Sequence, residues 1–297
     1  MNPLPRHVPV MAAEIVAQLA PPIGGIVVDG TLGGGGHTRE LATCVGNPGL
    51  VIALDRDPAA IDAAEQNLKG LPVTLVHSNY SDLPEVLEQL EIPAIDGCVL
   101  DLGLSSDQLA DRERGFSFDS AGPLDLRFDP LEGEPAWRIL ERLSESNLAD
   151  LIYNYGEERF SRRIAKKIVQ RRRSDPVRTA ADLSDLVRSC VPRPRHRGAI
   201  DSATRTFQAL RIAANDELKW LEVALERIPD CLAPGAKLAI ISFHSLEDRR
   251  VKHAFREDKR LEVLTKKPIG PSEEEQEANP RSRSAKLRVA QKLDTTQ

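Results

Sequence analysis

The chain has 297 residues, a net charge of −5, and a hydrophobic content of 41%, with only 4% aromatic residues. This length allows one large domain or two smaller ones, with a core built mainly of aliphatic side chains. No apolar run approaches the roughly 20 residues of a membrane span. Residues 1–7 lack the apolar core of a secretory signal. We therefore expect a soluble, cytoplasmic protein that does not contact membranes.

The cysteines are far apart in the chain and form no C-x-x-C pair; they are Cys44, Cys98, Cys190 and Cys231. This spacing argues against a structural zinc site and against a disulfide framework. Cys98 and Cys231 lie beside apolar residues, so we expect them to be core thiols.

The first hundred residues alternate between strand-like and helix-like segments. After an amphipathic helix at 11–19, strands are predicted at 26–29, 50–54, 73–76 and 95–100. Helices are predicted at 38–44 and 58–69, and a further helix is predicted after Ser81 or Asp82 as its cap. Four such alternations predict βαβ units and a parallel sheet.

The alternation stops after residue 103 and resumes at 237. Residues 107–135 are rich in Asp, Gly, Pro and Phe, which predicts an irregular loop. Helices are predicted at 140–155, 157–173, 179–190 and within 203–232, and strands at 237–242, 261–264 and 286–293. The polar segment 270–284 is expected to be a mobile loop. We predict one sheet-containing domain, formed by residues 1–106 and 214–297 and interrupted by a helical insertion at 107–213.

A glycine-rich turn follows the first predicted strand. That strand ends in Asp29, and four consecutive glycines occupy positions 33–36. Glycine allows a ligand to approach the main chain, and the carboxyl end of a strand in an α/β sheet is a common ligand site. A simple tight turn is the alternative. No register gives the G-x-G-x-x-G spacing of dinucleotide enzymes. The leading acid fits S-adenosylmethionine better, because an acid meets its ammonium and backbone N–H groups meet its carboxylate.

Three further residues follow the neighbouring predicted strands. Asp55 is placed to accept both ribose hydroxyls of a cofactor, or to cap the following helix. Tyr80 offers a ring for stacking on adenine, or is a half-buried surface aromatic. Asp101 lies at the edge of the same crevice, or caps a turn before Gly103. Because parallel strands end at one edge of the sheet, these residues converge on one pocket.

Seven segments together resemble one family. They are residues 29–38, 101–109, 114–118, 122–127, 156–164, 204–212 and 241–249. The chain is similar to the family of bacterial ribosomal RNA small subunit methyltransferases H, also called MraW. The resemblance implies an α/β fold, with a Rossmann-like class I methyltransferase sheet and an inserted all-helical domain. It also implies S-adenosylmethionine as cofactor, and methyl transfer to N4 of a cytidine in the decoding region of 16S rRNA in the small ribosomal subunit.

The resemblance also implies a set of cofactor-binding residues. They are Gly35, Gly36, His37, Asp55, Tyr80, Asp101 and Gln108. The position of Tyr80 is often Phe in the family, and either ring stacks. Asp107 stands where Pro is common, and Asp201-Ser202 stands where His-Pro is common. Neither departure falls on a cofactor position.

The exocyclic amine of cytosine is a poor nucleophile, because its lone pair is delocalised into the ring. We expect Asp101 and nearby carbonyl groups to accept the N4 hydrogens, with help from Ser105. His244, after the predicted strand 237–242, is a candidate proton acceptor, and a structural histidine is the alternative. No metal ligand set is predicted.

RNA binding requires phosphate contacts. The insertion carries eight cations along one predicted helical stretch, namely Arg159, Arg162, Arg163, Lys166, Lys167, Arg171, Arg172 and Arg173. Further cations lie at 193–197 and at 281–288. A solvated charged face is the alternative. Phe116 and Phe118 are expected either to stack on bases or to pack in the core.

Two other functions remain open at this stage. A nicotinamide-dependent oxidoreductase is disfavoured by the glycine spacing. A non-catalytic ribosome-assembly or RNA-binding factor would retain the fold, although nothing in the glycine turn, Asp55 or Asp101 looks degraded. The sequence does not indicate an oligomeric state.

Overall fold

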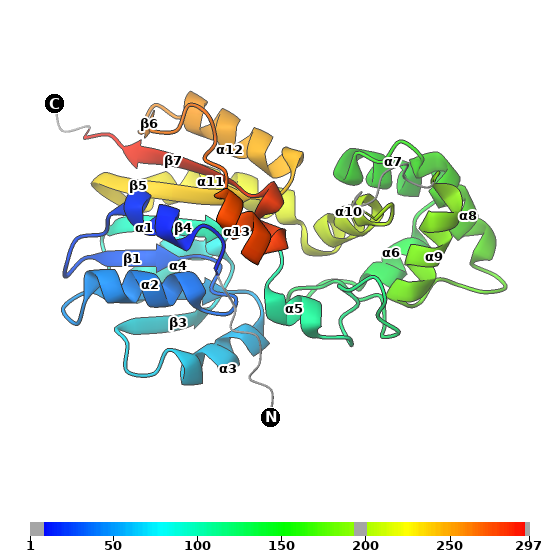
Figure 1. Ribbon diagram of the computed structural model, residues 1–297, viewed down its shortest axis with the longest axis horizontal. Coiled ribbons are helices and arrows are strands. Elements are labelled where there is room, and N and C mark those ends of the chain that lie inside the picture. Colours follow the sequence, from blue (N-terminus) through cyan, green and yellow to red (C-terminus); the bar gives the residue numbers. More distant parts are fainter. Residues whose placement is uncertain (1–8, 193–200, 295–297) are drawn as a thin grey trace. The chain divides into compact units, whose positions relative to one another are not determined.

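The computed structural model describes residues 9–192 and 201–294. Within them, seven strands form one sheet in the order β3-β2-β1-β4-β5-β7-β6, and β7 is antiparallel to both of its neighbours (Figure 1). The strands are β1 (Ile26–Asp29), β2 (Leu50–Asp55), β3 (Val73–His77), β4 (Ile95–Asp101), β5 (Leu232–Ser242), β6 (Leu261–Val263) and β7 (Lys286–Lys292). All seven strand predictions are confirmed.

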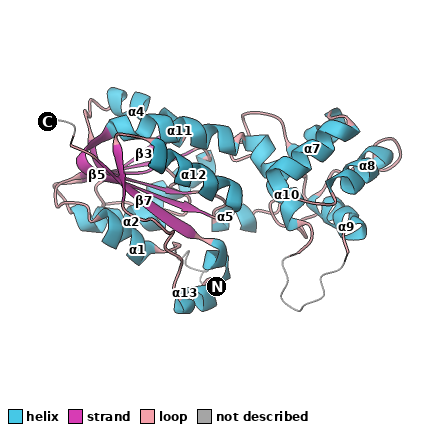
Figure 2. Ribbon diagram, turned by 90° about the horizontal axis from the view of Figure 1, so that it is seen from above, coloured by secondary structure: helices cyan, strands magenta, loops and turns pink. Residues whose placement is uncertain are grey.

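The central strands are buried on both faces, as their continuous apolar runs predict. Val27 belongs to the core cluster under α1 (Ala12–Leu19) and α2 (Gly36–Val45). Its neighbour Val28 belongs to the opposite cluster, under α4 (Leu83–Gln89), α11 (Glu217–Cys231) and α12 (Ser245–Glu257). Figure 2 shows these two helical layers on either side of the strands. Cys98 and Cys231 are buried in the second cluster, so the prediction of core thiols is confirmed.

Four further short elements complete this part of the chain. Helix α3 is Pro58–Asn67, and the 3₁₀ turn η1 is Tyr80–Asp82. Asp82, one of the two predicted caps, is the N-cap residue of α4, but its side chain makes no capping hydrogen bond. The side chain of Asn79 accepts from the Ser81 N–H and opens η1. The predicted mobile loop at 270–284 was wrong. Ser272 caps α13 (Glu273–Ala278), and the 3₁₀ turn η2 (Pro280–Ser284) follows.

The chain divides into two compact units. Unit 1 consists of Met1–Ser105 and Leu218–Gln297 and contains the sheet, and unit 2 is Ser106–Glu217. The described helices of unit 2 are α5 (Ser106–Ala110), α6 (Ala136–Arg142), α7 (Glu145–Gly156), α8 (Ser161–Arg171), α9 (Ala180–Cys190) and α10 (Thr204–Asn215). The α/β fold class, with a Rossmann-like sheet and a helical unit between β4 and β5, is confirmed.

Two helix boundaries in unit 2 differ from the prediction. The expected helix at 140–155 is two helices, because the Ser144 hydroxyl accepts from the Asn147 N–H and starts α7 anew. Glu157 was expected to open the next helix, but it ends α7 in a left-handed conformation with φ of 51°. A capping box starts α9, since the side chains of Thr179 and Asp182 each accept from the other's backbone N–H.

A buried side-chain amide helps to hold the long irregular segment of unit 2. The side chain of Asn215, at the end of α10, accepts from the Phe128 N–H at 2.7 Å and donates to the Leu126 carbonyl at 2.7 Å. Phe116 in the same segment stacks on Phe128, and Phe118 packs edge-on against Phe207. Core packing, the second of the two roles considered for Phe116 and Phe118, is therefore what the structure shows. None of the described helices has the length and apolarity needed to cross a lipid bilayer.

We expect Asn215→Ala to lower the free energy of unfolding by about 2–4 kcal/mol, because it leaves a buried N–H and a buried carbonyl without partners. Denaturant unfolding followed by circular dichroism measures the change. Asn154→Ala is the matched control, since Asn154 lies exposed on α7. Equal stability of the two variants would contradict the assigned role of Asn215.

Candidate active site

The glycine turn connects β1 to α2 at the carboxyl edge of the sheet. The Gly30 N–H donates to the Val99 carbonyl of β4 at 2.9 Å, and the Leu32 N–H donates to the Leu54 carbonyl of β2 at 2.9 Å. Gly33 and Gly35 have φ of 47° and 76°, a left-handed region that favours glycine. The turn is therefore fastened to both neighbours of β1 while its glycines reverse the chain.

The Asp55 carboxylate lies against this turn. It accepts from the Gly33 N–H at 2.8 Å with one oxygen and from the Asp57 N–H at 2.8 Å with the other. Asp57, not Asp55, caps α3 by accepting from the Ala59 N–H. Burial raises the pKa of Asp55 from 3.8 to about 6, against the lowering effect of the two N–H donors. The helix-cap alternative for Asp55 is therefore excluded, and the carboxylate is held at the strand end.

Asp29 lies beneath the turn and is fully buried. Its carboxylate accepts from the Thr38 hydroxyl at 2.7 Å and from the Thr31 N–H at 3.1 Å. The expectation that this acid meets a ligand's ammonium was wrong for this geometry, because no part of its side chain reaches solvent. Asp29 instead holds both ends of the glycine turn. Its burial raises its pKa, against the opposing effects of His37, Thr38 and Thr31.

His37 and Asp101 form a pair at the mouth of the turn. The His37 Nε2 atom lies 3.4 Å from the Asp101 Oδ2 atom, and the two side chains are 5% and 19% exposed. Burial lowers the pKa of His37, but the hydrogen bond and charge of Asp101 and the charge of Asp29 outweigh burial and raise the pKa above 6.5. The Asp101 backbone N–H also donates to the Thr31 hydroxyl at 2.6 Å.

The outer atoms of this pair are buried and have no hydrogen-bond partner among the described residues. They are the Asp101 Oδ1 and the His37 Nδ1. Buried polar atoms in folded proteins almost always have partners, so an unpaired acceptor beside a histidine indicates a place for a polar ligand. Sequence signals pointed to both of these residues, but not to Thr31, which ties Asp101 to the turn.

Tyr80 lies close to the ends of β1 and β4. A side chain at Gly30 would overlap the Leu100 side chain and come within 3.0 Å of the Tyr80 Cβ. Tyr80 is partly buried and packs against the core cluster beneath α4. Unit 1 thus brings the glycine turn, Asp55, Tyr80 and Asp101 to one edge of the sheet. Gln108 is a buried residue of α5 in unit 2, and its contact with a cofactor stays a prediction.

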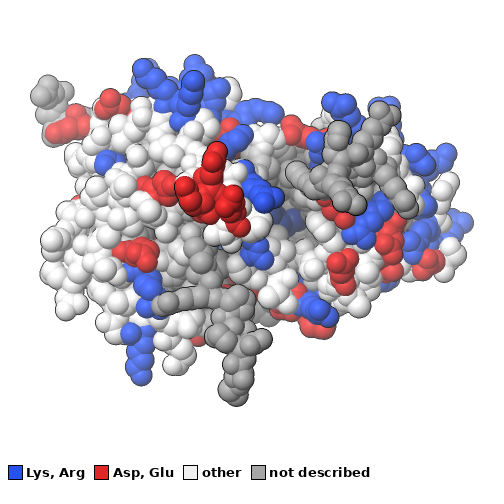
Figure 3. All heavy atoms as spheres, viewed as in Figure 1, with Lys and Arg blue, Asp and Glu red and all other residues white. Residues whose placement is uncertain are grey.

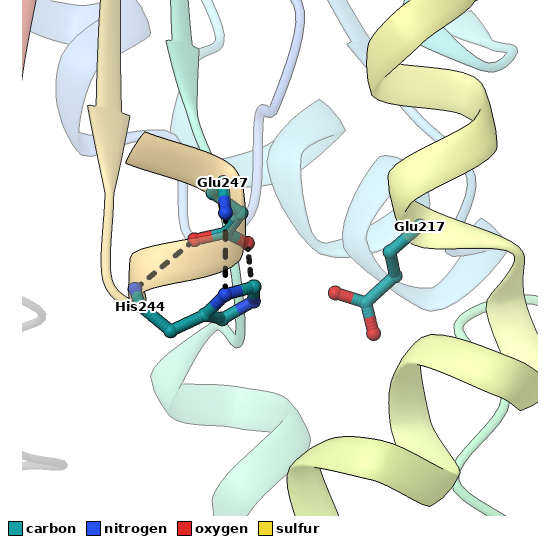
Figure 4. A group of neighbouring side chains, drawn as sticks. All are labelled: Glu217, His244 and Glu247. Carbon is teal, nitrogen blue, oxygen red and sulfur yellow. Dashed lines mark hydrogen bonds and ion pairs between the residues drawn. The ribbon is translucent and has the colours of Figure 1, made fainter. Parts of the chain in front are cut away.

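His244 is the N-cap of α12 in the structure. Its Nδ1 accepts from the Glu247 N–H at 3.4 Å, and its Nε2 lies 3.1 Å from the Glu247 Oε1. The Glu247 carboxylate accepts in return from the His244 backbone N–H (Figure 4). It also accepts from the Phe243 N–H. Both ring nitrogens therefore face Glu247 in a capping box. This geometry favours the structural alternative, and proton transfer by His244 stays a prediction.

Comparisons with known proteins show which family the chain belongs to. The sequence model of the MraW methylase family matches residues 5–293. The chain belongs to the MraW methylase family.

Two relatives of the chain carry the name ribosomal RNA small subunit methyltransferase H. The protein from Rhodopirellula baltica is 54% identical over 97% of this chain and 92% of its own length. The protein from Sorangium cellulosum is 50% identical over 98% and 93%. Among solved structures, an rRNA methylase from Streptococcus thermophilus is 15% identical, covers 99% of both chains and superposes with a TM-score of 0.46.

The expected cofactor, S-adenosylmethionine, is confirmed by membership of this methylase family. The residues present fit it. The unpaired Asp101 Oδ1 suits a hydrogen-bond donor of a bound ligand, and His37 suits a carboxylate. Each Asp55 oxygen already accepts one N–H and keeps a lone pair for a ribose hydroxyl. Membership of a methylase family gives no support to the alternative function, a nicotinamide-dependent oxidoreductase.

We expect the affinity for S-adenosylhomocysteine to fall below pH 6, by up to about tenfold per pH unit, as Asp55 becomes protonated. The sign follows because two ribose hydroxyls favour the carboxylate and therefore lower its pKa in the complex. His37 stays protonated in this range, since its pKa is raised above 6.5. Isothermal titration calorimetry from pH 5 to pH 8 measures the effect.

Asp55→Asn should bind S-adenosylhomocysteine about 10–100-fold more weakly, because each charge-assisted hydrogen bond contributes about 1.5–3 kcal/mol. The variant should also lose the fall in affinity below pH 6, which we call the acid limb. Asp62→Asn, an exposed change on α3, is the control and should behave like the wild type. An unchanged acid limb in Asp55→Asn would show that another group titrates.

Proposed function

We propose that this chain methylates N4 of a cytidine in the decoding region of 16S rRNA, within the small ribosomal subunit. The observation that carries the proposal is the unpaired, buried Asp101 Oδ1 at the end of β4, beside the glycine turn of a methylase fold. The names of the relatives support small-subunit rRNA as the substrate. The base and its N4 atom rest on the sequence resemblance. A substrate in the small ribosomal subunit also supports a cytoplasmic location for the enzyme.

The proposed cofactor-binding residues divide the ligand between them. Asp55 holds the ribose hydroxyls, Tyr80 stacks on the adenine, and the main chain of Gly35 and Gly36 accommodates the amino-acid end together with His37. The family resemblance also assigns Gln108 to cofactor binding. When bound, S-adenosylmethionine supplies an electrophilic methyl group on its sulfonium.

The proposed role of Asp101 is to orient the nucleophile. The N4 amine of cytosine donates a hydrogen bond to an Asp101 carboxylate oxygen, which keeps electron density on the nitrogen and fixes its direction. The nitrogen gains the methyl group and releases one proton to solvent water, so its final charge is unchanged. The His37 Nε2 lies 3.4 Å from the Asp101 Oδ2 and holds the carboxylate in place, which leaves Oδ1 directed to the nucleophile. Ser105 assists at the neighbouring loop.

The proposed RNA contacts in unit 2 are fewer than the sequence suggests. Arg172 donates to the Leu140 and Leu143 carbonyls, and Arg171 pairs with Asp175. These two arginines are therefore used within the fold. The cations left exposed on or beside α8 are Arg159, Arg162, Arg163, Lys166 and Arg173. The cations at 193–197 lie outside the described residues.

The third group of cations, at 281–288, is also partly used within the fold, because Lys286 and Arg288 both pair with Asp248.

We expect Asp101→Ala to lower kcat at least about 100-fold, since it removes the acceptor that orients the amine. Tritiated-methyl transfer to small subunits, with the modified nucleoside identified by mass spectrometry, measures rate and product together. Calorimetry with S-adenosylhomocysteine shows how much of the loss is cofactor binding. Asp62→Asn is the control. Methylation of any nucleoside other than cytidine by the wild type would refute the proposed substrate.

We expect the triple variant Arg162→Gln, Arg163→Gln, Lys166→Gln to weaken binding of a small-subunit RNA fragment. The slope of log affinity against log salt should become shallower by about 0.7–0.9 for each phosphate that the variant no longer neutralises. Fluorescence anisotropy at several salt concentrations provides both quantities. Arg142→Gln is the control, because Arg142 is exposed on α6 and pairs with Glu134. A salt slope equal to that of the wild type would argue that α8 presents only a solvated charged face.

A further inference from the structure

A cavity lies in unit 1, between α12 and the antiparallel edge of the sheet. Its volume is about 290 Å³, near the lower limit of roughly 300–1,000 Å³ for small-molecule sites. Its lining residues are Lys252, Phe255, Arg256, Val263, Thr265, Lys266 and Arg288. Four of these residues are cations and none carries a carboxylate.

The walls of the cavity are held by the fold. On α12, Val251 and Phe255 are buried in the core, so Lys252 and Arg256 are directed to the exposed side of the helix. Thr265 follows β6, and its hydroxyl accepts from the Val289 N–H of β7 at 2.9 Å. The floor is therefore fixed by buried groups, while long basic side chains form the rim.

The positive charge of the cavity is largely uncompensated. Arg288 is buried, and its Nε lies 2.7 Å from the Asp248 Oδ1, which holds the pKa of Asp248 below its usual range despite burial. Lys252, Arg256 and Lys266 are exposed and make no hydrogen bond or ion pair with the part of the chain that the structure describes. Figure 3 shows Lys and Arg gathered on the surface over α12 and β6.

The acids nearest in sequence do not neutralise this rim. Glu257 lies 3.6 Å from the exposed His253 as an ion pair. Glu262 is exposed on β6 and is not part of the lining. Three unpaired cations around a small cavity favour a compact anion with several acceptor oxygens, and a phosphate group has this chemistry.

We propose that this cavity binds a backbone phosphate of the RNA substrate, away from the cofactor site. The proposal rests on the proposed function. Helix α12 starts shortly beyond the carboxyl end of β5, and eight residues separate its cap His244 from Lys252, a rise of about 12 Å. The cavity therefore lies within reach of the RNA backbone that continues from the reacting cytidine. The exposed rim suits a long polyanion better than an enclosed metabolite.

The test is anisotropy with a labelled single-stranded RNA from the small subunit, using the double variant Lys252→Gln, Lys266→Gln and the single variant Arg256→Gln. We expect the double variant to bind about 5–20-fold more weakly at low salt, with a salt slope shallower by about 0.7–1.8. Lys69→Gln, an exposed change beyond α3, is the control and should equal the wild type. Thermal unfolding of each variant should match the wild type, because the changed side chains are exposed.

Methyl transfer separates this inference from the proposed function. The double variant should raise KM for RNA while kcat and S-adenosylhomocysteine affinity stay unchanged. If the wild type methylates RNA and the double variant has the same KM and salt slope, the cavity assignment is wrong and the function stands. If the wild type does not methylate RNA, the proposed function fails first.

Calorimetry with AMP and with inorganic phosphate provides a further arm. Submillimolar binding of either by the wild type, abolished in the double variant while RNA affinity is retained, would assign the cavity to a free phosphorylated metabolite and overturn the proposal.

Discussion

The site in unit 1 depends on one buried carboxylate, that of Asp29. A buried charge is costly unless hydrogen bonds offset the loss of water, and here the Thr38 hydroxyl and the Thr31 N–H supply them. These two donors lie on opposite sides of the four glycines, so one carboxylate fixes both ends of the turn. The Thr31 hydroxyl in turn accepts from the Asp101 N–H. The first strand, the turn, α2 and the end of β4 therefore form one connected polar network.

This network explains how the site keeps charged groups in a partly buried place. His37 lies near both Asp29 and Asp101, and the two acids favour its protonated form against burial. Asp55 is held by two N–H donors and still has a raised pKa. An ionised Asp55 therefore opposes folding above about pH 6, and this contribution is absent below pH 3.8, where the group is neutral in both states. Strongly shifted pKa values of this kind are common at sites where a group serves binding rather than stability.

The two units are stabilised in different ways. Unit 1 buries a sheet on both faces and carries acids at the ends of β1, β2 and β4. Unit 2 contains a long irregular segment whose backbone groups must still be satisfied, and Asn215 supplies partners for two of them. Several arginines that look free in the sequence serve the same purpose, as Arg172 does for two carbonyls. Cation counts along a helix therefore overstate the surface available to RNA.

The order of residues was enough to predict the strands, the glycine turn and the acids at the strand ends. Alternation and β-branched runs are local signals, and the parallel arrangement then brings Asp55 and Asp101 to one edge. The family resemblance added His37 and Gln108. Which polar atoms have partners emerged only from the folded chain. Packing turned Asp29 inward, moved the cap of α3 to Asp57 and placed the Phe116 ring in the core. It also set His244 in a capping box with Glu247. Each of these outcomes depends on side-chain direction or on a neighbour that is remote in sequence, and local sequence patterns carry no information on either.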